Sequence, residues 1–312
     1  MLIDMTGHLW DRDWLPSKMW DSIAWRAAKR SWPQRDPADI AKRAGAGRMD
    51  SSGKSHLEDM DKLGIQVMNI LPVDYGFMWD EEPPVRIEEI NRRTCEVARN
   101  SGGRITAFCG VDARRPGALE LFDRCVRDWD AKGLELYTTA GFYATDPRCQ
   151  KLYDRAIEFD VPVCFQTGQG GLRFLKYGDP IHLDEVAELN RDLTIIMEHA
   201  GGNLYSNMVW TAIDVAAFKP NVYLDVTEWF PEAFQDPAYF YRVLGIMLRR
   251  VGAHRILFGT HYPDRSKWMY EAWCDLWNSI EDRAKEHGLT ISKEQADLMR
   301  FGNAARLLKL NL

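Results

Sequence analysis

Short apolar runs alternate with longer segments of helical periodicity along the whole chain. Most of these runs are continuously apolar, which is typical of parallel strands that helices cover from outside. The chain offers eight candidate strands, at residues 2–5, 65–71, 104–111, 134–137, 161–166, 193–199, 221–227 and 255–260. Eight strands that alternate with helices predict an α/β fold, a (β/α)8 TIM barrel that forms a single domain over residues 1–312.

The helical segments carry their own start and stop signals. Between residues 116 and 133, apolar side chains on one helical face recur three or four positions apart, at Leu119, Phe122, Val126 and Trp129. Ser292 and Gln295 have capping-box spacing and predict the start of the last helix. A doubly wound open sheet is the alternative fold. It would need a glycine-rich phosphate loop after the first strand, and residues 4–10 do not form one.

A long insert separates the first candidate strand from the second. Residues 10–55 carry five of the twelve tryptophans, which are Trp10, Trp14, Trp20, Trp25 and Trp32. In a barrel this insert would lie over the mouth at the carboxyl ends of the strands. Because indoles mostly serve as large apolar anchors, packing of the insert on the barrel is the simpler interpretation. Cover for an aromatic ligand, or an oligomer interface, is the alternative.

Polar side chains gather where the candidate strands end, which is where barrel enzymes place their active sites. They are Thr6, His8, Glu135, Gln166, Glu198, His199, Asp225, Thr227, Glu228, His261 and Asp264. Neutral imidazole is a common ligand for zinc, iron, manganese and nickel. His8, His199 and His261 therefore predict a site for one divalent metal ion, and Glu135 adds a candidate fourth ligand. A hydrogen-bonded core histidine is the alternative interpretation for each imidazole.

Composition and charge exclude several classes of function. The net charge of −6 argues against a nucleic-acid binder, which needs basic patches. The sequence contains neither an apolar run of 18 residues nor a basic segment leading into an apolar one at its start. The six cysteines include no C-x-x-C pair, which favours buried free thiols. We therefore expect a cytoplasmic protein, without a membrane or nucleic-acid partner, that acts on a small molecule.

Six segments together resemble the amidohydrolase superfamily. They are LIDMTGHLW at 2–10, DMDKLGIQVMNILPVDYG at 59–76, DPRCQKLYDRAIEFDVPVCFQTG at 146–168, LTIIMEHAGG at 193–202, RILFGTHYPD at 255–264 and FGNAARLL at 301–308. Their order and spacing are most similar to the amidohydrolase-related branch that includes aminocarboxymuconate-semialdehyde decarboxylase and the hydroxybenzoate decarboxylases. The resemblance implies a metal-dependent enzyme on a TIM barrel, and a homo-oligomer.

The chain departs from the family pattern at several of the metal positions. The family carries histidine at the positions of Thr6 and Gln166, and aspartate at that of His261. Some branches place a lysine, which can be carbamylated to bridge two metals, at the position of Glu135. The retained ligands are His8 and His199. Because histidine at 261 still binds metal, the resemblance implies a site rebuilt for one ion rather than a binuclear centre.

The leading functional hypothesis is a metal-dependent lyase, in particular a decarboxylase, or a hydrolase of a small carboxylated or hydroxylated cyclic substrate. The ion, zinc foremost with manganese or iron as alternatives, would stabilise the charge that develops as CO2 leaves or water adds. The candidate catalytic acids and bases, each of which could instead orient a ligand histidine, are Glu198, Glu228 and Asp264. The candidate substrate contacts are Thr6, Trp10, Gln166 and Arg173.

Two further hypotheses belong to other classes. A site of three histidines and one glutamate also suits iron or manganese with dioxygen, as in an oxygenase subunit built on this fold. A non-catalytic subunit that pairs with a related amidohydrolase-like chain is the third hypothesis. Metal analysis separates the first two from the third. The sequence does not identify the substrate.

Overall fold

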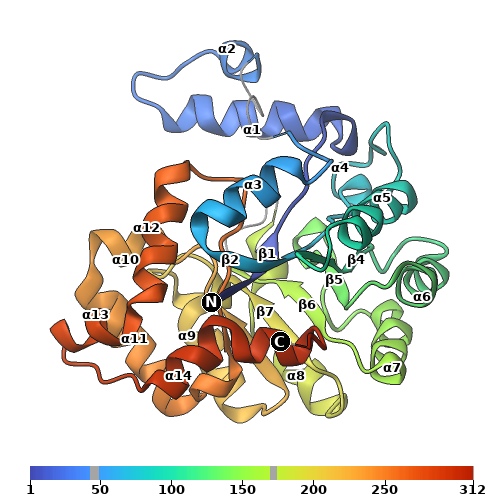
Figure 1. The fold of residues 1–312 in the computed structure, drawn as a ribbon. Coiled ribbons are helices and arrows are strands. Elements are labelled where there is room, and N and C mark those ends of the chain that lie inside the picture. The colour runs from blue at the N-terminus through green and yellow to red at the C-terminus, as the bar shows by residue number, and fades with distance from the viewer. Residues whose placement is uncertain (43–48, 169–173, 312) are drawn as a thin grey trace.

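The computed structural model describes residues 1–42, 49–168 and 174–311, and shows parallel strands enclosed by helices (Figure 1). The strands are β1 (Leu2–Gly7), β2 (Ile65–Ile70), β3 (Ile105–Ala107), β4 (Cys109–Gly110), β5 (Leu134–Leu136), β6 (Val163–Gln166), β7 (Ile195–Glu198), β8 (Val222–Asp225) and β9 (Ile256–Leu257). Each candidate strand of the sequence overlaps one of these elements, and the third overlaps two, β3 and β4. The predicted (β/α)8 barrel is confirmed.

Two hydrogen-bonded ladders, β1-β2-β3 and β4 through β9, make up the barrel wall, and all of their pairings are parallel. The chain passes from one ladder to the other through Phe108, whose N–H donates to the Ile70 carbonyl at 2.9 Å. The ring closes after β9, where the N–H of His261 donates to the Thr6 carbonyl at 2.8 Å. The segments that follow β1 and β9 are therefore direct neighbours at the mouth.

The helices form an outer layer, an insert and a tail (Figure 1). They are α1 (Ser17–Arg30), α2 (Pro37–Ala41), α3 (Lys54–Leu63), α4 (Gly76–Trp79), α5 (Ile87–Asn100), α6 (Ala118–Trp129), α7 (Gln150–Phe159), α8 (His182–Leu189), α9 (Asn207–Phe218), α10 (Phe230–Gln235), α11 (Pro237–Arg250), α12 (Lys267–Asn278), α13 (Ile280–Glu286), α14 (Lys293–Asp297) and α15 (Asn303–Leu307). The predicted capping box is confirmed, since Ser292 and Gln295 exchange side-chain and backbone bonds at the start of α14.

Apolar side chains fill the barrel, and the tail closes its amino-terminal end. Phe108 and other strand residues form an inner cluster, against which Ala304 and Leu308 pack. The side-chain amide of Asn303 donates to the carbonyl of Ile256, at the start of β9, at 2.8 Å. The tail therefore packs against the end of the barrel opposite the mouth.

The tryptophans of the insert differ in burial. Trp14 is buried in the main core, and Trp10 and Trp20 pack against it. Trp25 and Trp32 are 56% and 93% exposed. In Figure 1, α1 and α2 lie together at the top of the molecule, off the ring of helices. Part of the insert therefore anchors to the barrel, and part faces outward.

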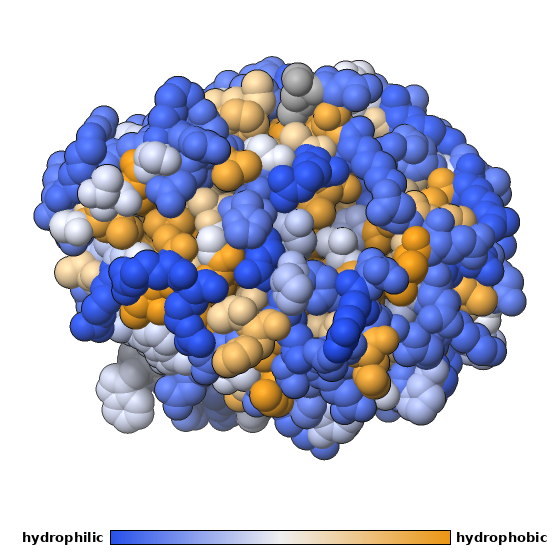
Figure 2. Space-filling model, turned by 90° about the horizontal axis from the view of Figure 1, so that it is seen from below, coloured by the Kyte–Doolittle hydropathy of each residue, from blue (hydrophilic) through white to orange (hydrophobic). Residues whose placement is uncertain are grey.

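The face shown in Figure 2 is mainly hydrophilic, with apolar residues in small separated groups. Single exposed apolar side chains are ordinary on such surfaces. No helix in the described ranges has both the length and the apolar character of a membrane span. All six cysteines are buried and unpaired, as the sequence predicts.

A buried carboxyl group fastens the seam of the barrel. Asp4, on β1, accepts the N–H of Thr260 at 3.0 Å and also the hydroxyl of Thr260, which follows β9. Its Oδ1 accepts the N–H of Thr6 at 3.0 Å as well. Burial raises the pKa of Asp4 to about 7, against the effect of these hydrogen bonds. The two neighbouring segments of the mouth are thus held in register by one side chain.

We predict that Asp4→Ala lowers the free energy of unfolding by about 2–4 kcal/mol, because it leaves two N–H groups and a hydroxyl without an acceptor in the interior. Asp4→Asn should cost about 1 kcal/mol or less, because its amide oxygen still accepts. Urea unfolding measures both, with the exposed Asp39→Ala as control. Equal stability of the alanine variant and the control would contradict this role.

Candidate metal centre

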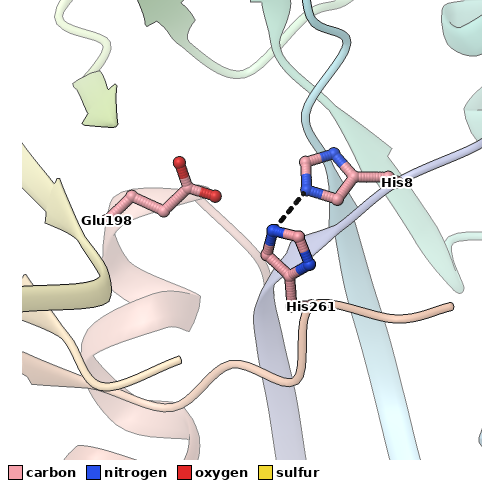
Figure 3. Close-up of side chains that lie close together, drawn as sticks. All are labelled: His8, Glu198 and His261. Atoms are coloured by element: carbon pink, nitrogen blue, oxygen red, sulfur yellow. Dashed lines mark hydrogen bonds between the residues drawn. The ribbon is translucent and has the colours of Figure 1, made fainter. Parts of the chain in front are cut away.

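Three side chains from distant parts of the sequence meet at the barrel mouth (Figure 3). His8 follows β1, Glu198 ends β7, and His261 lies in the loop after β9. One potential ligand atom from each lies within 4.8 Å of the other two. Figure 3 shows the Glu198 carboxylate pointing toward the two imidazole rings. The three residues form the 2-His-1-carboxylate set that mononuclear sites use.

The two imidazoles face each other through their Nε2 atoms, which are 3.2 Å apart. Nδ1 of His8 lies 2.8 Å from the Leu71 carbonyl, which can only accept, so Nδ1 carries the hydrogen. Burial lowers the pKa of His8 to about 3. His8 is therefore neutral, and its Nε2 presents a lone pair to His261.

Carboxylates hold the opposite side of His261. Its Nδ1 lies 3.1 Å from Oδ2 of Asp264 and 3.7 Å from Oε1 of Glu228. The indole N–H of Trp10 donates to the other oxygen of Asp264 at 3.0 Å. Burial opposes protonation of His261, but the Asp264 carboxylate outweighs it and raises the pKa of His261 above 6.5. These contacts place a hydrogen on Nδ1 and aim Nε2 at His8.

Either a proton or a metal ion satisfies this arrangement. With Nδ1 hydrogens on both rings, two lone pairs would oppose each other unless a cation lies between them. Zinc binds imidazole nitrogen at roughly 2.0–2.1 Å, so two such ligands of one ion stand about 3 Å apart. A backbone carbonyl on one imidazole and a carboxylate on the other are the partners that ligand histidines commonly have. The residues fit a divalent ion.

Glu198 supplies the buried negative charge that such an ion would need. The residue is 1% exposed, and its Oε1 has no hydrogen-bond partner in the structure. Burial, and next the neighbouring carboxylate of Glu135, raise the pKa of Glu198 well above its usual value. An unpaired buried carboxylate is costly, and a cation beside it removes that cost. This orphaned oxygen is a second sign that the site fits a metal ion.

His199 lies beside this group rather than within it. Its ring centre is 5.1 Å from that of His261, and its Nε2 is 3.5 Å from Oε1 of Glu198. Burial lowers its pKa well below 6.5, against the opposing effect of a hydrogen bond with the Thr227 backbone. His199 is thus a neutral imidazole at the mouth, available as a further ligand or as a proton carrier.

Glu135 is placed deeper in the barrel than the predicted ligand set requires. It groups with Cys164 and Glu198, while the tight group of His8 and His261 does not include it. Burial raises the pKa of Glu135 to about 8. A hydrogen bond with the side chain of Cys164 opposes the effect of burial. The structure therefore puts Glu198, which the sequence assigned to proton transfer, where Glu135 was expected.

Local backbone conformation turns three of these side chains toward the mouth. His199, Glu228 and His261 have φ values of 63°, 73° and 58°, in the left-handed region that non-glycine residues seldom adopt. Each comes shortly after a strand end. Strained residues of this kind cluster at functional sites, where the surrounding structure holds them. This conformation has no signal in the sequence.

The four predicted substrate contacts have different outcomes. Trp10 lines the cavity at the mouth. Thr6 is buried and donates its hydroxyl to Asp225, so it ties β1 to β8. Gln166 is buried, and its amide lies 3.3 Å from the Thr167 carbonyl. Neither of these two residues is among the described residues that line the cavity. Arg173 lies outside the described residues.

The cavity that His8 and His261 line has a volume of about 290 Å³. Its polar end contains the histidines with Glu228, Asp264 and Arg265, while aromatic and aliphatic side chains, from the insert and from the loops after β2 and β5, form its remaining wall. Ligand pockets typically start at about 300 Å³, so a small molecule fits. Arg265, the direct neighbour of Asp264, lines this cavity and was not among the residues predicted from the sequence.

The comparisons with known proteins agree with this picture. A sequence profile of the amidohydrolase family matches residues 3–310. The chain belongs to the amidohydrolase family. The resemblance that the six sequence segments predicted is therefore confirmed. Members of this amidohydrolase family are metal-dependent enzymes, with decarboxylases and hydrolases among them, and usually bind a divalent ion. None of the curated proteins matches the chain.

Several solved amidohydrolase structures share the fold. A 2,6-dihydroxybenzoate decarboxylase in complex with 2,6-dihydroxybenzoate has 18% identity and a TM-score of 0.68, over 99% of both chains. A 5-carboxyvanillate decarboxylase from Sphingomonas paucimobilis has 14% identity and a TM-score of 0.72, over 99% of both. An amidohydrolase from Burkholderia multivorans with bound zinc has 16% identity and a TM-score of 0.66, over 100% of both. At these identities the likeness supports the fold alone.

We predict that the affinity for metal falls as the pH is lowered, because the metal ion must displace the proton on His261. The raised pKa of His261 means that this competition extends above pH 6.5. Below the pKa of His261, the Kd for zinc should rise by at least about tenfold for each unit by which the pH is lowered. Above that pKa, the Kd should become constant. Competition with a chromophoric chelator between about pH 5.5 and 8 measures this.

Asp264→Asn should move the same profile to lower pH, since the carboxylate that raises the pKa of His261 is gone. Its affinity at high pH should also fall by about 10–100-fold, because a partner that orients a ligand is lost. Asp214→Asn, at an exposed ion pair with Arg250, is the control. A zinc affinity that does not change with pH would show that His261 is not a ligand.

Proposed function

We propose that this protein is a mononuclear metal-dependent lyase or hydrolase of a small carboxylated or hydroxylated ring, with decarboxylation as the leading reaction. The observation that carries the proposal is the pair of Nε2 atoms, 3.2 Å apart, with the Glu198 carboxylate beside them. His8, His261 and Glu198 would hold the ion, with zinc foremost. The decarboxylases of the same fold support a reaction of this class.

When bound, the ion would supply Lewis-acid chemistry for a substrate oxygen. Residues of the chain itself would orient the ligands and move protons. Asp264 and Glu228 hold His261. Burial opposes ionisation of Asp264, but the hydrogen bond with His261 outweighs burial and lowers the pKa of Asp264 below its usual range. Asp264 therefore stays ionised and acts by positioning. His199, a neutral imidazole at the cavity wall, is placed to move a proton at the substrate.

The insert would shield this chemistry from water. Leu15, Met19 and Trp20 cover the cavity from the insert side. Trp10 stacks on His8 with ring centres 5.0 Å apart and an interplanar angle of 24°. A flat ring bound near His8 would meet aromatic surface rather than solvent. Water exclusion of this kind strengthens charge interactions in a site.

A second candidate function follows from the same residues. Two histidines and one carboxylate are also the ligand set of non-heme iron oxygenases. In that case iron would occupy the site, and turnover would consume dioxygen.

Partners and location remain proposals. We expect a homo-oligomer, in which the exposed indoles of Trp25 and Trp32 would find a partner surface. Pairing with a related amidohydrolase-like subunit is the alternative. A cytoplasmic location is consistent with the six unpaired cysteines.

We predict close to one divalent ion per chain in protein purified without chelator. His8→Ala, His261→Ala and Glu198→Gln should each weaken zinc binding by at least about 100-fold, because each removes a ligand. His254→Ala, an exposed histidine away from the mouth, should bind like the wild type. Elemental analysis and zinc titration measure these effects. CO2 release from hydroxybenzoates then tests the leading reaction, and oxygen uptake tests the second candidate.

Fewer than about 0.2 ions per chain after supplementation with zinc, manganese and iron would overturn both enzyme proposals and leave the non-catalytic subunit. Unchanged zinc binding in the His8 and His261 variants would show that the ligands are elsewhere.

A further inference from the structure

Arg265 brings a positive charge into the wall of the cavity. Among the described residues that line the cavity it is the single arginine or lysine. Its side chain is 36% exposed and forms an ion pair with Glu228. Its backbone N–H donates to the hydroxyl of Tyr270 at 2.5 Å, which fixes the start of the side chain. The guanidinium is therefore held at the polar end of the cavity.

The ion pair leaves part of the guanidinium available. Within the described ranges, its hydrogen bond to Glu228 uses Nη2. A guanidinium has five N–H donors in a planar fork, which matches both oxygens of a carboxylate. Glu228 also lies 3.7 Å from Nδ1 of His261 through its other oxygen. Only the side chain of Glu228 would thus separate a carboxylate bound to Arg265 from the candidate metal ligand His261.

The other side of the cavity suits an apolar, flat body. Trp10 and Tyr75 have ring centres 6.2 Å apart, and Tyr75 contacts Tyr137 edge-on at 5.5 Å. Met19 and Trp20 complete this wall from the insert. A positive group at one end and aromatic surface at the other select for a ring that carries an anionic group.

We propose that Arg265 is the anchor for the carboxylate of a small aromatic acid in this cavity. The inference rests on the proposed function, because it names the substrate class of that site. Glu228 neutralises the guanidinium and holds it at the wall, and the substrate carboxylate binds the remaining edge of the fork. Arg265 thereby selects acids over neutral rings.

The test compares benzoate with benzamide, a neutral probe of the same shape, by calorimetry on metal-free and zinc-loaded protein. Arg265→Met should weaken benzoate binding by about 30-fold or more in both forms and leave benzamide within about twofold. Arg265→Lys should fall between, since an ammonium lacks the fork. The control is Arg249→Met, an exposed arginine on α11. Zinc content and urea midpoints confirm that the variants fold and hold metal.

Benzoate binding within about threefold of wild type in metal-free Arg265→Met would overturn the anchor, as would wild-type protein that does not bind benzoate or binds benzamide equally well. These results are separable from failure of the proposed function. If the protein holds no metal but its benzoate binding depends on Arg265, the anchor is supported and the metal-dependent reaction is contradicted. If the protein holds metal but its benzoate binding does not depend on Arg265, the anchor is contradicted and the proposed reaction is not affected.

Discussion

The candidate site depends on the approach of two imidazole nitrogens across the seam of the barrel. His8 and His261 are 253 positions apart in the chain, and only closure of the ring brings their Nε2 atoms to 3.2 Å. The Leu71 carbonyl fixes one ring, and Asp264 fixes the other. Because both rings then present Nε2 to the same point, that point must hold a cation, either a proton or a metal ion. The cavity, the carboxylates and the insert are all arranged around it.

Several buried carboxyl groups lie in the barrel interior, which explains why a cation there would be stabilising. Asp4, Glu135, Glu198 and Asp225 are each 1% exposed or less. Burial raises the pKa of each of them. Threonine hydroxyls and backbone N–H groups donate hydrogen bonds to Asp4 and Asp225, which offsets the cost of burying these two carboxyl groups. Glu198 retains an oxygen without a hydrogen-bond partner, so a divalent ion beside it would offset the cost of burying negative charge.

The sequence predicted the parts of this structure that follow from periodicity. Continuous apolar runs located the barrel strands, and polar residues after them located the mouth, since parallel strands bring their carboxyl ends together. Helix faces were predicted less well. In α6 the buried side chains include Leu121 and Cys125, whereas Leu119, Val126 and Trp129 are only partly buried. Neighbours α5 and α7 contact both flanks of α6 and decide which side faces inward.

The choice between adjacent residues could not be predicted from the sequence. Glu198 and His199 are consecutive, and which one faces His8 depends on where β7 ends and on the left-handed backbone at His199. Glu135 was a candidate fourth ligand because it is a carboxylate on a candidate barrel strand, but its position on β5 groups it with Cys164 and Glu198. Thr6 looked like a lost ligand, whereas it serves the fold through Asp225.

A crystal structure of the zinc-loaded protein, with anomalous data at the zinc edge, would show directly which residues hold the ion. We predict one peak at roughly 2.0–2.2 Å from Nε2 of His8, Nε2 of His261 and an oxygen of Glu198. A peak that instead lies beside Glu135 and Cys164, or one bound by His199 without His8, would contradict it.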